Sequence, residues 1–209
     1  ARLVEYWDEN LPELLHILNL MLKLGTTDQN EAILRSPMLL PRLRPLLALN
    51  VDTRGPVLSI LSTISKEKAQ NLRITKMGFP SYLIDLCDDP SCDDPTVPLD
   101  ILVSLASCHP RDVSYDGILK GVCRTMSKEN QPTSVLENCV RLLHLALDRG
   151  ACPNLLASSG IMGISLNCLK ATNSKQPGVL SKFEEDLAYV IVNAAGLQRD
   201  KSQLVEQGV

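Results

Sequence analysis

The chain has 209 residues, 44% of them hydrophobic, so it is long enough to bury the core of one or two ordinary domains. Its apolar side chains are mostly aliphatic, with 37 leucines against one Trp, four Tyr and two Phe, and this favours helices packed on helices over an aromatic-rich β-sandwich. The net charge of −3 argues against nucleic acid as a partner, because binding phosphate backbones requires a basic surface.

Membrane insertion and secretion are also not expected. No apolar run approaches the roughly 18 residues that a spanning helix needs, and the N-terminal residues lack the basic-then-apolar order of a signal peptide. The seven cysteines are an odd number, and no Asn-x-Ser/Thr sequon occurs. Unpaired thiols persist in reducing compartments, so we expect a cytoplasmic or nuclear protein.

The predicted elements begin with an apolar helix over Asp8–Leu24. A short helix over Asn30–Arg35 then leads through Pro37 to a second helix at Pro41–Leu47, and a longer apolar helix follows at Pro56–Lys66. This order of short, second and long helix is the first complete unit of a repeat.

The same plan recurs along the rest of the chain. Residues 71–86 contain a short helix, a Gly-Pro corner at Gly78–Pro80 and a second helix, before a long helix at Thr96–Cys108. Further long helices are predicted at Ser134–Arg149 and Leu180–Leu197. The pieces at 154–169 and 201–208 repeat the short-helix and corner pattern, whereas the short first helix of the 111–149 unit is barely visible.

Each long helix carries one polar residue within an apolar core. These residues are separated by 44, 41, 40 and 49 positions, a regularity that an irregular helical bundle does not produce. In chain order they are Asn19, Thr63, Ser104, His144 and Asn193.

On these residues the chain resembles the armadillo-repeat family, with HEAT-type repeats as the nearest alternative. The resemblance implies an all-α, right-handed solenoid of about four three-helix repeats, with partial repeats at both ends. One domain, 1–209, would then divide into a partial repeat 1–29, full repeats 30–70, 71–110, 111–151 and 152–200, and the start of another at 201–209.

In that family the third helices line a concave groove, where the polar residue often bonds the main chain of an extended partner. The resemblance gives this role to Asn19, Thr63, Ser104, His144 and Asn193, with Tyr189 as the aromatic anchor. The alternative is that these side chains bond neighbouring helix carbonyls or face water. The Trp residues with which nuclear-import adaptors hold lysine stems are absent, so recognition of ordinary nuclear-localisation signals is not expected. The corresponding residues are Leu15, Ser59, Asp100, Val140 and Tyr189.

Charge is distributed in blocks. From residue 31 to 80 eight Lys/Arg oppose three Asp/Glu, giving +5, and from 81 to 118 one Arg opposes eight Asp, giving −7. The blocks could promote contact between copies of the chain, or could only decorate solvated faces. The tandem Cys87–Ser91 and Cys92–Thr96 resembles no known metal motif, so we expect a helix break and an acidic helix start there.

We therefore expect a protein–protein interaction scaffold or adaptor that binds an extended or helical segment of a partner along the groove. The alternatives are a chaperone or assembly factor for a folded client such as a myosin motor, and a self-associating scaffold. Phosphate-loop, nucleophile-elbow and zinc-protease motifs are absent, so an enzyme is not expected, nor is a cofactor, a metal or a small-molecule substrate.

Overall fold

The computed structural model describes residues 11–25, 27–49, 51–92, 94–109, 113–149, 160–172 and 181–197. Within these ranges the chain forms helices and no strand, which confirms the all-α prediction. None of these helices is long and apolar enough to cross a membrane. In chain order the helices are α1 Leu11–Leu24, α2 Thr27–Leu34, α3 Leu39–Leu49, α4 Val51–Ile64, α5 Lys68–Lys76, α6 Phe79–Asp88, α7 Thr96–Cys108, α8 Tyr115–Met126, α9 Thr133–Asp148, α11 Ile161–Thr172 and α12 Lys182–Leu197.

The chain divides into two compact units, Ala1–Val113 with α1–α7 and Ser114–Val209 with α8–α12. We call them unit 1 and unit 2. The division lies next to the predicted border between the repeats 71–110 and 111–151. The prediction of a single domain, the number of repeats and the handedness of the solenoid stay predictions.

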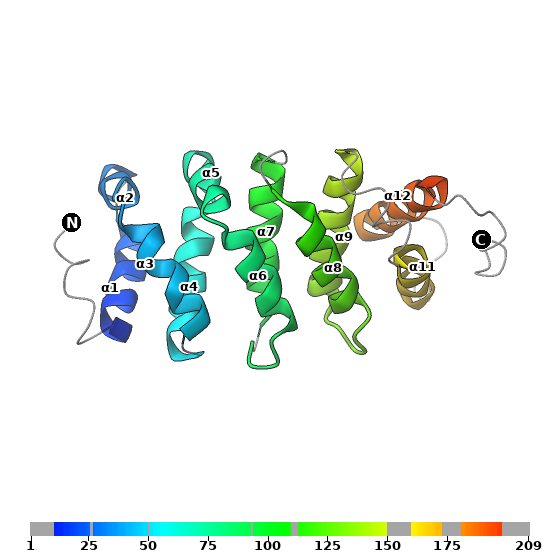
Figure 1. The fold of residues 1–209 in the computed structure, drawn as a ribbon, viewed down its shortest axis with the longest axis horizontal. Coiled ribbons are helices and arrows are strands. Elements are labelled where there is room, and N and C mark those ends of the chain that lie inside the picture. The colour runs from blue at the N-terminus through cyan, green and yellow to red at the C-terminus, as the bar shows by residue number, and fades with distance from the viewer. Residues whose placement is uncertain are drawn as a thin grey trace. The chain divides into compact units, whose positions relative to one another are not determined.

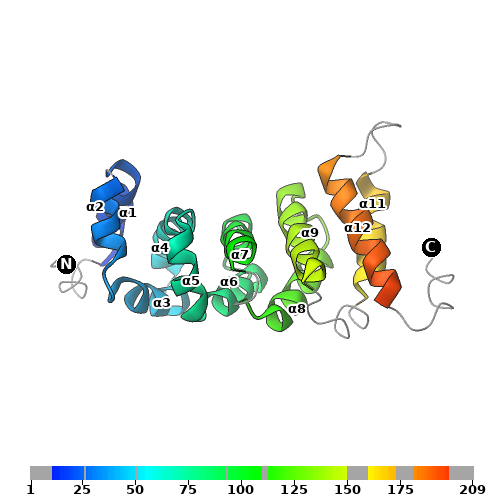
Figure 2. The same ribbon diagram turned by 90° about the horizontal axis from the view of Figure 1, so that it is seen from above.

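Unit 1 has two layers of helices. The long helices α1, α4 and α7 lie side by side in one layer, with α4 packed against both of the others (Figures 1 and 2). Helices α3 and α6 form the second layer, where α3 packs on α4 and α6 packs on α7, while the short α5 contacts both α6 and α7. The order short, second and long helix therefore occurs twice, as α2–α3–α4 and α5–α6–α7.

The interior of unit 1 is aliphatic. The predicted long helices turn one apolar face toward the second layer, which removes that face from water and stabilises the packing. Its fully buried side chains include Leu15 of α1, Leu43 and Leu47 of α3, Ile60 and Leu61 of α4, Ile74 of α5, Phe79 and Leu83 of α6, and Leu99 and Leu105 of α7.

The corner between α5 and α6 follows the expected chemistry. Gly78 has a φ of 77°, in the left-handed region that glycine adopts without strain. Pro80 lies in the first turn of α6, where its missing N–H is not needed. The start of α4 differs from expectation, because the helix begins at Val51 and contains Pro56. Pro56 lies beyond the first turn of α4, where a proline removes a helical hydrogen bond, yet the helix continues through it, so Pro56 did not mark the boundary.

Unit 2 is built from two helix pairs. Helix α8 packs on α9 and α11 packs on α12, and the pairs meet through α9 with α12 and α8 with α11. Residues 113 and 114 lead directly into α8 without a short helix, in keeping with the weak pattern there. The predicted elements at 154–159 and 201–208 lie outside the described residues.

Candidate functional site

Unit 1 presents three of the predicted groove residues on its layer of long helices. Asn19 of α1, Thr63 of α4 and Ser104 of α7 are all partly exposed. Asn19 accepts a hydrogen bond of 3.1 Å from the Ser59 hydroxyl at its Oδ1, and Thr63 donates one of 3.0 Å to the Ser59 carbonyl. Asn19 of α1 therefore contacts α4 at the Ser59 side chain, whereas the Thr63 bond lies within α4, one turn later.

Ser104 makes a different contact. Its hydroxyl donates a hydrogen bond of 2.8 Å to the carbonyl of Ser65, just after the last residue of α4. A helix leaves its last carbonyls without intrahelical partners, so this bond satisfies one of them and ties α7 to the end of α4. For Ser104 and Thr63 the bonds to helix carbonyls match the alternative considered from the sequence.

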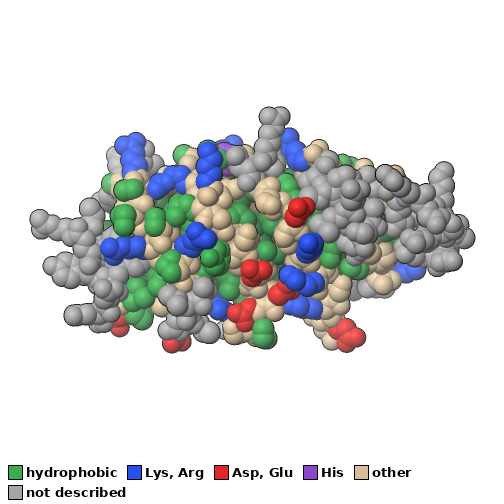
Figure 3. All heavy atoms as spheres, viewed as in Figure 1, with side chains coloured by type: hydrophobic (Ala, Val, Ile, Leu, Met, Phe, Trp, Pro, Cys, Tyr) green, Lys and Arg blue, Asp and Glu red, His purple; other side chains and the backbone are tan. Residues whose placement is uncertain are grey.

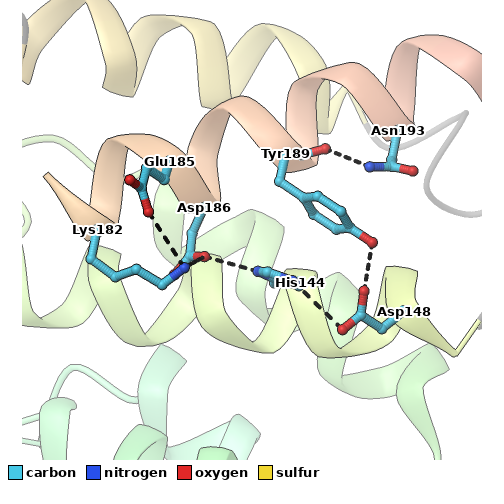
Figure 4. A network of polar contacts seen from close by, with 7 residues as sticks. All are labelled: His144, Asp148, Lys182, Glu185, Asp186, Tyr189 and Asn193. Atoms are coloured by element: carbon cyan, nitrogen blue, oxygen red, sulfur yellow. Dashed lines mark hydrogen bonds and ion pairs between the residues drawn. The ribbon is translucent and has the colours of Figure 1, made fainter. Parts of the chain in front are cut away.

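In unit 2 the remaining predicted residues lie in one polar network between α9 and α12 (Figure 4). The rings of His144 and Tyr189 are stacked, with centroids 4.2 Å apart and planes 22° from parallel. His144 Nδ1 lies 2.9 Å from Asp186 Oδ1. A carboxylate only accepts hydrogen bonds, so Nδ1 is the nitrogen that donates in this contact. The other nitrogen, Nε2, faces Asp148 at 3.6 Å.

Two further charged contacts complete the network. Tyr189 donates a hydrogen bond of 2.5 Å to Asp148 Oδ1, and this bond, assisted by burial and the carboxylate charge, raises the pKa of Tyr189 above 10.0. Lys182 Nζ lies 2.9 Å from Asp186 Oδ1, and hydrogen bonding with Asp186 and its charge raise the pKa of Lys182. Asp186 therefore has two cationic or donor partners at the same oxygen.

Asn193 joins this network only through the main chain. Its Nδ2 donates 2.8 Å to the carbonyl of Tyr189, one turn earlier on α12. Within the predicted set, His144 and Tyr189 contact each other, Asn19 bonds the Ser59 hydroxyl, and the other three bond main-chain carbonyls, namely Thr63, Ser104 and Asn193. Each of the six side chains has a partner within its own unit.

The sequence did not identify the carboxylates of the network. Asp148 follows His144 by four residues on α9, and this helical spacing was a signal that could have found it. Asp186 lies on another helix, and nothing in the local sequence indicates its contact with His144.

A cavity of about 360 Å³ opens beside the network. Its lining comes from α9 and α12 and carries two cations, two carboxylates, an amide and an aromatic ring. Asp186 and Lys182 belong to both the cavity and the His144 network, so a group entering the cavity meets that network directly. The lining residues are Glu137, Asn138, Arg141, Lys182, Phe183 and Asp186.

The tandem segment after α6 forms turns. Asp89 Oδ1 accepts hydrogen bonds from the Ser91 main-chain N–H at 2.8 Å and from the Ser91 hydroxyl at 2.6 Å. Asp94 Oδ1 accepts from the N–H of Thr96, the first residue of α7, at 2.9 Å. Asp94 therefore supports the helix start, as expected from the acidic run. The described residues contain no group of three or more His, Cys, Asp or Glu side chains arranged to hold a metal ion.

Comparison with known proteins adds no relative. No protein-family model and no curated protein sequence matches the chain.

Proposed function

We propose that the chain is a protein-interaction module of the armadillo class, a right-handed solenoid of about four three-helix repeats. The twofold occurrence of short, second and long helices in unit 1 supports this class, and HEAT-type repeats are the alternative. The module binds an extended or helical segment of a partner protein along its long helices, without catalysis, cofactor, metal or nucleic acid. The cysteines in the described part of the chain form no disulfide, which supports a cytoplasmic or nuclear protein; they are Cys87, Cys92, Cys108, Cys123, Cys139 and Cys168.

The observation that carries the proposal is the packing of α1 on α4, which brings Asn19 into a hydrogen bond with Ser59, one turn before Thr63. Residues 44 positions apart in the sequence lie on neighbouring long helices, and both are partly exposed. The Oδ1 atom of Asn19 is occupied by Ser59, whereas no described residue accepts a hydrogen bond from its Nδ2. That amide group can donate to the main-chain carbonyl of a partner segment.

In unit 2 the proposed contact is the His144–Tyr189 stack with the adjoining cavity. The stacked rings give a fixed apolar surface with polar edges, which suits an anchor for a partner side chain. Arg141 and Glu137 in the cavity lining offer charges of both signs. A partner side chain that enters the cavity can therefore be recognised by charge as well as by shape.

The test begins with selection of random 16-residue peptides displayed on phage against the purified chain. Asn19→Asp keeps the oxygen that Ser59 needs but removes both N–H donors. We expect this substitution to lower the affinity for the selected peptides about 3- to 10-fold, the range for loss of one hydrogen bond. The matched control is Asn130→Asp, the same chemical change at an exposed loop residue, and it should leave affinity unchanged.

Other outcomes separate the alternatives. Equal binding of the peptides to wild type, Asn19→Asp and Tyr189→Ala would overturn the proposal. Selection that yields no peptide, together with binding of an intact myosin motor domain, would favour the chaperone or assembly factor. Concentration-dependent sedimentation of the chain alone would favour the self-associating scaffold.

A further inference from the structure

A basic surface lies on unit 1, on helices other than the long ones. We define it by Arg35, Arg42, Arg44, Arg73 and Lys76, which come from α3, α5 and the turn between α2 and α3. On the face shown in Figure 3, Lys and Arg side chains gather over the region of α2, α3 and α5. This part of the chain carries the +5 block found in the sequence.

Two of its arginines are held in position by neutral groups. Arg73 donates to the carbonyl of Leu34 at 2.6 Å and to that of Ser36 at 3.1 Å, so its guanidinium is fixed beside the turn that carries Arg35. Arg44 lies over the ring of Tyr82, 4.9 Å from its centroid, and donates 3.2 Å to the Tyr82 hydroxyl. Because both side chains are already ordered, binding an anion costs less conformational entropy.

The positive charges of Arg44, Arg73 and Lys76 are not neutralised locally. None of the three forms an ion pair with a carboxylate of the described residues, and Arg44 and Lys76 are exposed. Arg44 Nη2 lies 3.8 Å from the point that a β-carbon on Gly78 would occupy, so the guanidinium lies at the corner after α5, the helix that ends with Lys76. Uncompensated charges of one sign attract a partner of the opposite sign.

The chemistry at Arg44 suits a carboxylate. Its contact with Tyr82 occupies one face of the guanidinium and one N–H donor, which leaves the planar fork with donors for a second, bidentate contact. The Tyr82 hydroxyl accepts from Arg44, so its own proton can be donated to the same anion. Lys76, exposed at the end of α5, adds a second positive charge.

The surroundings favour a short acidic peptide over a long polyanion. Asp85 is exposed on α6, one turn after Tyr82, and the Asp-rich segment begins at Asp88, the last residue of that helix. These carboxylates would repel a nucleic acid that continues past Tyr82. A peptide needs to place only a few Asp or Glu side chains on the surface.

We propose that the basic surface of unit 1 binds an acidic peptide segment of a partner protein, with Arg44, Tyr82 and Lys76 as the carboxylate contacts. This interaction is independent of the long-helix groove and does not rest on the function proposed above. Groove variants such as Asn19→Asp should leave it unchanged.

The probe is a fluorescent peptide with five Asp residues among Gly and Ser, titrated by anisotropy at low salt with the full chain. Lys76→Gln together with Arg44→Gln should weaken binding about tenfold or more, because two charge-assisted contacts are lost. The matched control removes the same charge at exposed sites elsewhere, with Lys66→Gln and Lys120→Gln, and should change affinity less than about twofold. Equal weakening by both pairs would overturn the proposal.

A second variant tests whether the planar geometry of the Arg44 guanidinium matters, and melting of the same variant shows whether it is folded. Arg44→Lys keeps the charge but removes the planar fork, so affinity should still fall severalfold while the melting temperature of the chain is retained. Unchanged affinity of Arg44→Lys would show a nonspecific charge effect and overturn the proposal. A single-stranded oligonucleotide of equal charge that binds more tightly than the peptide, and is weakened by the same substitutions, would also overturn it.

Discussion

Arg54 and Asp89 form an ion pair of 2.9 Å between α4 and the turn that follows α6. The same guanidinium donates to the Ser91 hydroxyl at 2.9 Å and to the carbonyl of Leu47 at 3.3 Å. The Asp-rich turn is thus attached to the interior of unit 1 by a buried arginine. This contact gives the first half of the tandem segment a structural role.

Arg54→Met should destabilise the chain. The side chain of Arg54 is 11% exposed, and its loss leaves the Leu47 carbonyl and the Ser91 hydroxyl without this donor. Lost hydrogen bonds to a charged group of this kind cost about 1–3 kcal/mol. Urea unfolding followed by circular dichroism measures the change, and an unchanged midpoint would show that the turn contributes nothing to stability.

Asp89 should make the stability of the fold depend on pH in the acidic range. Hydrogen bonds from the Ser91 hydroxyl and main-chain N–H, and then the charge of Arg54, lower the pKa of Asp89 below 3.8. A folded-state pKa below the unfolded value stabilises the fold above about pH 4, and this contribution is lost as the pH falls through the folded pKa. The melting temperature of wild type should therefore exceed that of Asp89→Asn at about pH 6, and the difference between the two should narrow toward about pH 3. A gap independent of pH would contradict this assignment.

Most of the helical order could be predicted because apolar periodicity and corner chemistry are local properties. Gly78 and Pro80 mark the α5–α6 corner through backbone conformation alone, and the structure places it there. The start of α4 could not be predicted from Pro56, because the helix continues through this proline although it lies beyond the first turn, where a proline costs a hydrogen bond. Packing decides between these starts, and packing depends on distant residues.

The candidate site was less predictable for a related reason. Spacing identified His144 as a polar groove position and Tyr189 as the residue one turn before Asn193, but the stacking of their rings depends on how α9 and α12 meet. The contact of His144 with Asp186 joins residues 42 positions apart, and no local pattern reports it. Sequence periodicity therefore found positions, and the hydrogen-bonding partners came only from the fold.

Gly78→Ala should destabilise the chain through its backbone. Gly78 has a φ of 77°, and an added β-carbon would meet only Arg44 Nη2 at 3.8 Å, an ordinary contact. The cost is therefore conformational, about 1–2 kcal/mol for an L-residue in the left-handed region.

Gly55→Ala is the matched control, since Gly55 lies in α4 with open space around it. Alanine there should raise the free energy of unfolding by about 0.5–1 kcal/mol. Chemical denaturation of both variants measures whether the free energy of unfolding falls in Gly78→Ala and rises in Gly55→Ala. Destabilisation by Gly55→Ala would contradict the helical assignment.

Tyr189→Phe should remove a contribution to stability that wild type loses at alkaline pH. The hydrogen bond to Asp148 raises the pKa of Tyr189 above the unfolded value of 10.0. A raised folded-state pKa stabilises the fold fully below about pH 10, and this contribution is lost as the pH rises through the folded pKa. Wild type should therefore exceed Tyr189→Phe in stability at about pH 8, and the gap should close at strongly alkaline pH. Phenylalanine keeps the stack on His144, so the comparison isolates the hydroxyl. The control is Asp148→Asn, in which the phenol should ionise at lower pH when followed by ultraviolet absorbance. A phenol that titrates identically in wild type and Asp148→Asn would show that the bond between α9 and α12 is not formed in solution.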